Sequence, residues 1–135
     1  MSFNYQNGRL HAENVAVSEI AKKFGTPFYC YSTSTLINNF RKYIEAFSDY
    51  PTQICFAVKS NSNINVLKIL AEIGSGADTV SQGEIMRSLK AGISADKIVF
   101  SGVGKTRSEI EYALKQNVGQ INAESREEIE IIDKI

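Results

Sequence analysis

The sequence predicts an α/β protein built from consecutive parallel βα units. Four short apolar segments begin at residues 54, 77, 98 and 120, so their starts are 23, 21 and 22 residues apart. Each is followed by a longer segment in which apolar residues recur at helical spacing. Strands that alternate with helices at this period form either a doubly wound sheet or part of a (β/α)8 barrel. We therefore expect residues 53–135 to form four βα units and residues 1–52 to form an N-terminal arm.

The helices of these units have recognisable ends. Three of the four begin with a hydroxyl residue that is followed three positions later by glutamate, which is the pattern of a capping box. These pairs are Ser81 and Glu84, Thr106 and Glu109, and Ser125 and Glu128. Gly74 and Gly92 are expected to end the first two helices. The strands are expected at residues 54–58, 77–80, 98–100 and 120–122.

The arm has a less regular pattern. Apolar residues on both sides of Gly8 predict a hairpin. A short helix is expected to open at Ser18, and residues 28–31 have the composition of a strand. Thr33 or Ser34 is then expected to cap a longer amphipathic helix.

Composition excludes several kinds of partner. The chain has 135 residues, is 43% hydrophobic and carries 15 basic and 15 acidic residues, which is typical of a globular domain. It has no basic cluster that would bind nucleic acid, no apolar stretch that would span a membrane and no signal peptide, so we expect a cytoplasmic protein. Cys30, Cys55 and His11 form no metal motif, so no metal is expected.

Lys59 is the residue with the clearest chemical potential. It follows the apolar segment 54–58 and precedes a polar loop. Loops at the carboxyl ends of parallel strands hold the active sites of α/β proteins, so Lys59 is a candidate Schiff-base nucleophile. The alternative is a solvated lysine with no chemical role, and position alone favours that alternative.

Residues 101–106, Ser-Gly-Val-Gly-Lys-Thr, lie between a strand and a helix and resemble the end of a phosphate-binding P-loop. That motif needs another glycine at position 99, where this chain has Val99. Thr106 is already explained by its capping box. Nucleotide binding is therefore a minor alternative.

Asp78 is unusual because it lies within a strand expected to be covered on both faces. A carboxylate in such a strand needs a partner, and the strand that ends near Lys59 is expected to be its neighbour. An ion pair between Lys59 and Asp78 is therefore reasonable. A structural role for Asp78, in a buried ion pair or bonded to loop amides, is an equal alternative to a functional role. Capping alone accounts for Glu84.

Several motifs together resemble a known family. They are residues 25–31 (Gly-Thr-Pro-Phe-Tyr-Cys-Tyr), 56–63 (Phe-Ala-Val-Lys-Ser-Asn-Ser-Asn), 74–84 (Gly-Ser-Gly-Ala-Asp-Thr-Val-Ser-Gln-Gly-Glu) and 97–102 (Lys-Ile-Val-Phe-Ser-Gly). In order and spacing they resemble the N-terminal part of the diaminopimelate decarboxylases, which belong to the alanine racemase-like (fold type III) pyridoxal-phosphate enzymes. The resemblance covers nearly the whole chain. It implies an α/β fold that is the first half of a (β/α)8 TIM-type barrel with an N-terminal arm.

The resemblance also implies a function. It implies that Lys59 forms a Schiff base with pyridoxal 5'-phosphate, that Asp78 and Glu84 lie near the cofactor and that Ala57 lines its pocket. The implied enzyme is a cytoplasmic homodimer, a carboxy-lyase that converts the small amino acid meso-2,6-diaminopimelate to L-lysine in lysine biosynthesis.

The chain departs from the family in two ways. Ser101 stands where relatives commonly have histidine. The sequence also ends after four βα units, so the family's glycine-rich phosphate-binding loop and C-terminal β domain are absent from these residues. We therefore expect the 135-residue chain alone to be inactive, and to associate through an uncovered sheet face rich in Phe, Val and Ile. The alternatives are an inactive truncated fragment or a related amino-acid decarboxylase of the same fold.

Overall fold

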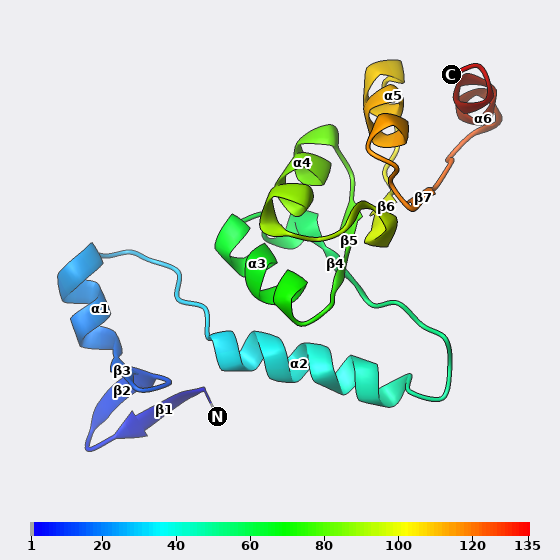
Figure 1. The fold of residues 1–135 in the computed structure, drawn as a ribbon. Helices are drawn as coiled ribbons and strands as arrows, with labels where there is room; N and C mark the ends of the chain where they lie inside the picture. Colours follow the sequence, from blue (N-terminus) through cyan, green and yellow to red (C-terminus); the bar gives the residue numbers. More distant parts are fainter. Residues whose placement is uncertain (1) are drawn as a thin grey trace. The chain divides into compact units, whose positions relative to one another are not determined.

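The computed structural model describes residues 2–135, which form two compact units (Figure 1). The first unit ends at Ala46, and the second runs from Phe47 to Ile135. The residues that carry the predicted chemistry, Lys59, Asp78 and Glu84, all lie in the second unit.

The first unit contains a small antiparallel sheet and two helices. Its strands are β1 (Phe3–Gln6), β2 (Arg9–Ala12) and β3 (Val15–Ala16), in that spatial order, and its helices are α1 (Val17–Phe24) and α2 (Thr33–Ala46). Tyr5 pairs with Leu10 across the turn at Asn7 and Gly8, both of which have positive φ angles. This pairing confirms the hairpin predicted around Gly8.

Three expectations for the first unit are wrong. Ser18 lies inside α1 and does not cap it, because the N-cap position is Ala16. Residues 28–31 form no strand, since the described residues offer them no strand to pair with. The start of α2 is capped by Ser32, whose hydroxyl accepts from the Thr35 N–H (3.1 Å).

The second unit contains the four predicted parallel strands, hydrogen-bonded in the order in which they occur along the chain. They are β4 (Cys55–Ala57), β5 (Gly76–Thr79), β6 (Ile98–Phe100) and β7 (Gln120–Ile121). They are followed in turn by α3 (Ile64–Glu72), α4 (Gln82–Ala91), α5 (Arg107–Lys115) and α6 (Arg126–Asp133), and short 3-10 turns occur at Val58–Ser60 and Ala95–Lys97. A doubly wound sheet reverses its strand order at a switch point, whereas a barrel does not. The sequential order is therefore that of a barrel segment, which is not closed in this chain.

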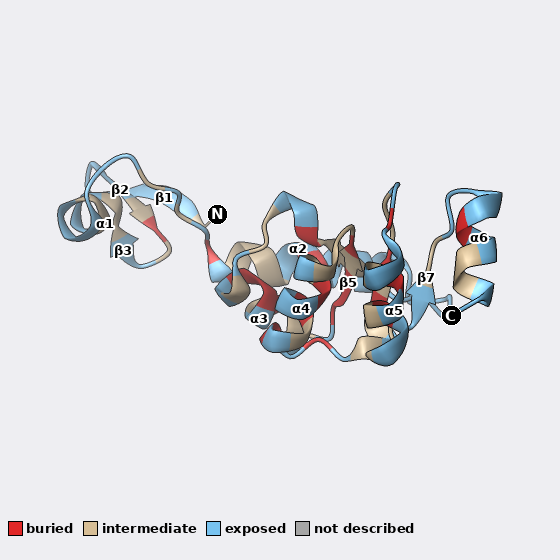
Figure 2. Cartoon of the chain, turned by 90° about the horizontal axis from the view of Figure 1, so that it is seen from above, coloured by how far each residue is buried: buried red, intermediate tan, exposed pale blue. Residues whose placement is uncertain are grey.

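The helices cover one face of this sheet, and that face carries the large apolar residues. Side chains in a strand alternate between faces, so Phe56, Ala77, Ile98 and Phe100 share the face that packs on the helices. Figure 2 shows the resulting buried residues on β5, α3 and α4. Val58, Leu67 and Ile85 are fully buried in the same core, so packing holds the segment next to Lys59.

The opposite face differs from the expectation of a surface rich in Phe, Val and Ile. Alternation places mainly small and polar residues there, namely Cys55, Ala57, Gly76, Asp78 and Gln120, with Val99 as the one branched apolar side chain. The prediction was wrong because the large apolar residues of these strands point toward the helices. This face can therefore line a polar cavity without exposing large apolar side chains.

The helix starts follow the predicted capping pattern. The hydroxyls of Ser81 and Ser125 accept from the backbone N–H groups of Glu84 (3.3 Å) and Glu128 (3.1 Å). Thr106 and Glu109 form a complete, reciprocal capping box. Gly92 ends α4 in the left-handed conformation, as expected of a C-terminal glycine.

The Thr106 capping box yields a pH-dependent prediction. The backbone N–H and the hydroxyl of Thr106 donate to Glu109 and hold the pKa of its carboxyl below the ordinary value of 4.5. A lowered folded-state pKa means that the carboxylate stabilises the fold above about pH 4.5 and that this stabilisation is lost on acidification below it. Thr106→Ala should lower the free energy of unfolding by about 1 kcal/mol at pH 7 and by less at pH 3.5. Urea unfolding at both pH values tests this, with Ser94→Ala as the control, because Ser94 is exposed and its hydroxyl caps nothing. An equal loss at both pH values would contradict the prediction.

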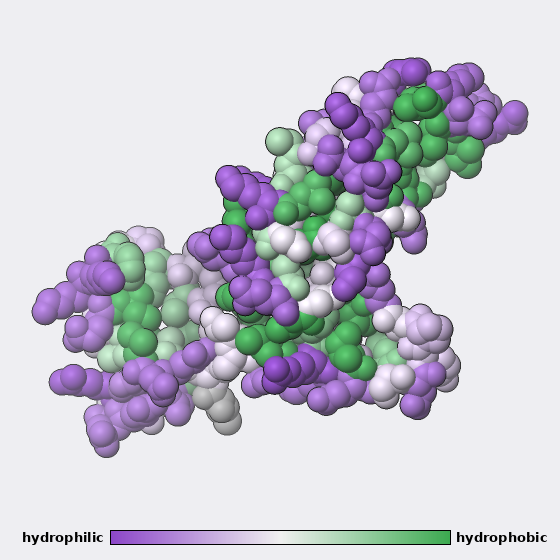
Figure 3. Space-filling view, viewed as in Figure 1, coloured by the Kyte–Doolittle hydropathy of each residue, from purple (hydrophilic) through white to green (hydrophobic). Residues whose placement is uncertain are grey.

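The sheet has open edges at β4 and β7. Beside the edge at β7, α5 exposes Leu114 and α6 exposes Ile129, and Ile135 is exposed after the end of α6. Figure 3 shows hydrophobic surface over these two helices. Over residues 2–135, none of the helices combines the length and the apolar character that crossing a bilayer requires.

Candidate functional site

Lys59 lies at the carboxyl end of β4, in the 3-10 turn Val58–Ser60. Two bonds fix this turn: the Asn61 N–H donates to the Val58 carbonyl (3.0 Å) and the Ser60 hydroxyl donates to the Ala57 carbonyl (2.7 Å). Val58 is fully buried, whereas Lys59 is exposed. Its amine is therefore presented at the sheet edge on a firmly held backbone and is accessible to a carbonyl compound.

Asp78 lies on the neighbouring strand, and its Cα pairs in register with that of Ala57. The carboxylate is half-buried, and its Oδ1 accepts a 2.6 Å hydrogen bond from the Ser101 hydroxyl. Among the described residues Lys59 forms no ion pair, so the expected Lys59–Asp78 pair is wrong. The two residues nevertheless both lie at the carboxyl end of the sheet. Ser101 is the hydrogen-bond partner that Asp78 required.

Glu84 holds the turn that follows β5. Its Oε2 accepts from the Val80 N–H (2.8 Å), two residues after Asp78 on the chain. The Glu84 N–H donates to the Ser81 hydroxyl, which completes the helix start. Glu84 therefore fixes the backbone between Asp78 and α4, and its carboxylate lies at the same edge of the sheet.

Lys105 is a buried residue whose role differs from that suggested by the P-loop-like sequence. Its side chain is 1% exposed, and its Nζ donates to the carbonyls of Gly102 and Asn122 (both 2.7 Å) and to Glu128 (3.2 Å). A P-loop lysine must be free to reach a phosphate, but these internal partners engage all three donors of Lys105. The geometry therefore removes the support for nucleotide binding at this loop.

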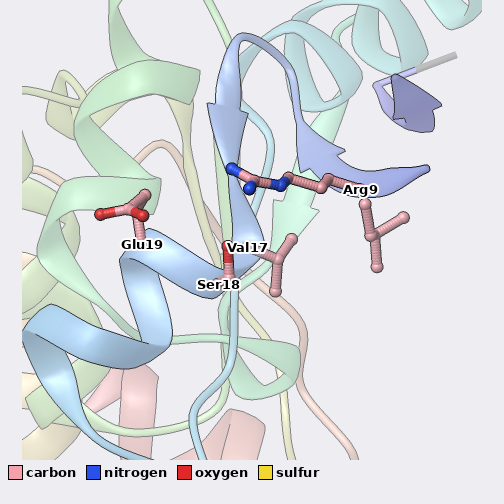
Figure 4. A pocket seen from close by; sticks show the side chains of 5 residues that line it. Arg9, Val17, Ser18 and Glu19 are labelled. Atoms are coloured by element: carbon pink, nitrogen blue, oxygen red, sulfur yellow. The ribbon is translucent and has the colours of Figure 1, made fainter. Parts of the chain in front are cut away.

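The remaining features add no second chemical centre. Figure 4 shows an open pocket in the first unit, lined by Arg9, Val17, Ser18 and Glu19 together with Leu10. Nothing in the sequence pointed to this pocket. Across the described residues no group of three His, Cys, Asp or Glu side chains is placed to hold a metal ion, and both cysteines are free thiols.

Comparison with known proteins identifies the domain. A family model described as "Pyridoxal-dependent decarboxylase, pyridoxal binding domain" matches residues 32–135. The chain belongs to this family.

Curated relatives of this decarboxylase domain have consistent names. The chain is 52% identical over 128 residues to "Diaminopimelate decarboxylase" of Pseudomonas fluorescens, a match that covers 95% of this chain and 31% of the relative. It is 43% identical over 131 residues to the protein of the same name from Aquifex aeolicus, with 97% and 31% covered. The chain therefore spans about a third of the length of the relatives that it matches.

Solved structures share this fold. The diaminopimelate decarboxylase of M. jannaschii in complex with L-lysine superposes with a TM-score of 0.95 at 33% identity, covering 98% of this chain and 32% of that one. The Helicobacter pylori enzyme complexed with L-lysine gives a TM-score of 0.85 at 47% identity, covering 87% of this chain and 30% of that one. The half-barrel thus has the geometry of the N-terminal portion of these enzymes.

The residues of this decarboxylase domain fit a pyridoxal cofactor. An aldehyde requires an accessible primary amine, which Lys59 supplies, and a flat ring requires a sheet face without bulky side chains, which Ala57 and its neighbours supply. The sequence predicted site roles for Lys59, Asp78, Ala57 and Glu84. It marked Ser101 only as a departure from the family and gave Asn122 no role. The signal available for Ser101 was its position just after the third strand, two residues beyond Val99, the register partner of Asp78.

Proposed function

We propose that this chain is the N-terminal part of a pyridoxal 5'-phosphate-dependent diaminopimelate decarboxylase, a carboxy-lyase that forms L-lysine from meso-2,6-diaminopimelate in lysine biosynthesis. The observation that carries the proposal is the placement of Lys59 at the carboxyl end of β4, beside the strand of Asp78, in a domain of this family. The names of the relatives and the L-lysine bound in two related structures support this choice of substrate.

Each of the proposed site residues has a different role in holding the cofactor. Lys59 supplies the amine that holds it covalently, and Ala57 leaves room for it on the sheet face. Asp78 supplies a negative charge whose position the Ser101 hydroxyl fixes, and Glu84 holds the adjoining turn. When bound, pyridoxal phosphate supplies the electron sink that stabilises the carbanion left by departing carbon dioxide.

The proposal includes a larger assembly. Residues after Ile135 would continue the barrel from the open edge of β7 and cover the exposed side chains of α5 and α6. The homodimer and the cytoplasmic location expected from the sequence remain predictions. The 135-residue chain alone should be inactive, because the phosphate-binding loop implied by the family resemblance is not among its residues.

A substrate panel tests the proposed function. The complete gene product, with whatever residues its reading frame encodes after Ile135, would be loaded with pyridoxal phosphate and assayed for carbon dioxide release. Diaminopimelate should be turned over at least about 100-fold more efficiently than ornithine, arginine or lysine, because a site that bonds the second amino-acid head group rejects analogues that lack it. A preference for ornithine or arginine would establish the related-decarboxylase alternative, and no release from any substrate would favour the inactive fragment.

Asp78 provides a prediction about cofactor retention. Asp78→Ala should weaken pyridoxal phosphate binding by about tenfold or more, since it removes a positioned charge from the site. Glu109→Ala is the matched control, because Glu109 is a carboxylate of the same sheet-and-helix unit that serves a helix cap. Fluorescence titration of the apoprotein measures both variants. Equal weakening in the two would assign Asp78 a purely structural role.

A further inference from the structure

A chain of side-chain hydrogen bonds crosses the carboxyl edge of the sheet. Asp78 Oδ1 accepts from the Ser101 hydroxyl (2.6 Å), and the same hydroxyl oxygen accepts from Asn122 Nδ2 (3.1 Å). Asn122 Oδ1 in turn accepts from Gln120 Nε2 (2.6 Å). The bonds link β5 to the residues that directly follow β6 and β7. This series of hydrogen bonds thus ends at Asp78, on the strand next to β4, which Lys59 follows.

The direction of these bonds is set by chemistry. A carboxylate can only accept, and the Nδ2 of an asparagine can only donate. The Ser101 hydroxyl proton is therefore directed at Asp78, while its oxygen receives the Asn122 donor. A hydroxyl that accepts one hydrogen bond becomes a better donor in the next, and a bond to a charged acceptor is shorter and stronger than a neutral one.

Backbone hydrogen bonds hold Ser101 and Asn122, the two middle residues of this hydrogen-bond network. The Ser101 N–H donates to the Thr79 carbonyl (2.7 Å), and the Asn122 N–H donates to the Phe100 carbonyl (3.0 Å), so both residues continue the sheet ladder. Lys105 braces them further, because its buried Nζ bonds the carbonyl of Asn122 and that of Gly102, the residue after Ser101. Ser101 and Asn122 are half-buried and are therefore anchored by three buried residues, Thr79, Phe100 and Lys105.

We propose that Ser101 and Asn122 are positioning residues that fix the Asp78 carboxylate for the cofactor held by Lys59. The proposal rests on the proposed function, and it assigns Ser101 a role of its own. Ser101 acts through Asp78 by setting the orientation of the carboxylate, and Asn122 acts through Ser101 by aligning its hydroxyl. The ligand class concerned is the pyridoxal ring.

Paired substitutions test this role in the complete gene product without substrate. Ser101→Ala should weaken pyridoxal phosphate binding by about tenfold and alter the relative heights of the absorbance bands of the bound cofactor, since one bond to a charged group is lost. Ser101→Thr keeps the hydroxyl and should restore both the affinity, to within about threefold of the wild type, and the spectrum. Asn122→Leu, nearly the same in size, should change both readouts in the same direction as Ser101→Ala. Ser94→Ala is the control, because Ser94 is exposed and its hydroxyl caps nothing.

The outcomes separate this inference from the function on which it rests. Wild-type protein that binds no pyridoxal phosphate would overturn the proposed function and the inference with it. If the wild type binds pyridoxal phosphate, two results would overturn the positioning role alone. One is an unchanged affinity and spectrum in Ser101→Ala, and the other is a Ser101→Thr variant that behaves like Ser101→Ala. Should Ser101→Ala fail to fold, the Thr and Asn122→Leu variants decide the question: wild-type behaviour in Asn122→Leu contradicts the proposal.

Discussion

Lys59→Ala should reduce decarboxylation by more than about a thousandfold and abolish covalent retention of pyridoxal phosphate. The amine at this position is exposed at the edge of the sheet, and the fully buried Val58 beside it holds its backbone. An alanine cannot bond to the cofactor aldehyde, and no other amine among the described residues occupies the carboxyl end of β4. Turnover of diaminopimelate and the absorbance of the dialysed protein measure both effects.

Lys68→Ala is the matched control for this loss. Lys68 is also exposed, but it lies within α3. Its replacement should leave turnover within about twofold of the wild type, as expected of an exposed side chain away from the site. A Lys59→Ala variant that keeps full activity would remove Lys59 from the chemistry, and equal losses in both variants would point to a general effect of lysine removal.

Lys105→Met should lower the free energy of unfolding by about 3 kcal/mol or more. The Lys105 amine and the Glu128 carboxylate form an ion pair at 3.2 Å, with side chains only 1% and 9% exposed. With methionine at this position, the buried Glu128 carboxylate keeps only the hydrogen bond from the Glu124 N–H (2.7 Å). The carbonyls of Gly102 and Asn122 also lose the hydrogen bonds that the Lys105 amine donates to them. Urea unfolding of the complete gene product, followed by circular dichroism, gives the change.

Two comparisons sharpen the Lys105 prediction. Arg107 and Glu111 form an exposed pair on α5 at 2.8 Å, so Arg107→Met should cost no more than about 0.5 kcal/mol. The double variant Lys105→Met/Glu128→Leu should recover part of the loss, because removing both charges relieves the unpaired carboxylate. A Lys105→Met variant as stable as Arg107→Met would show that the buried pair does not brace the sheet edge.

The regular half of this protein could be predicted from local patterns. The strands and helices of the second unit repeat every 21 to 23 residues in sequence, and their caps depend on residues three positions apart, as at Thr106 and Glu109. Lys59 and Asp78 could be placed at one edge for the same reason, because sequential βα units put neighbouring strands side by side.

Several of the errors arose where the deciding partner is distant in sequence. Residues 28–31 have strand composition, but a strand also needs a neighbour, which composition does not reveal. The bond between Ser101 and Asp78 spans 23 residues, and the sequence could not show that this hydroxyl, and not the amine of Lys59, would meet the carboxylate. The sequence argued against a P-loop at Lys105 but could not reveal the partners of this lysine, because Asn122 and Glu128 lie 17 and 23 residues away.

The covalent attachment of the cofactor gives the most direct test of the central claim. Pyridoxal phosphate would be bound to the complete gene product, reduced with borohydride and located by mass spectrometry after digestion with trypsin. Trypsin does not cut at a modified lysine, so attachment at Lys59 predicts a single labelled peptide of residues 43–68 with the reduced cofactor on Lys59. Attachment to any other lysine, or no stoichiometric labelling at all, would contradict the assignment of Lys59 as the cofactor lysine.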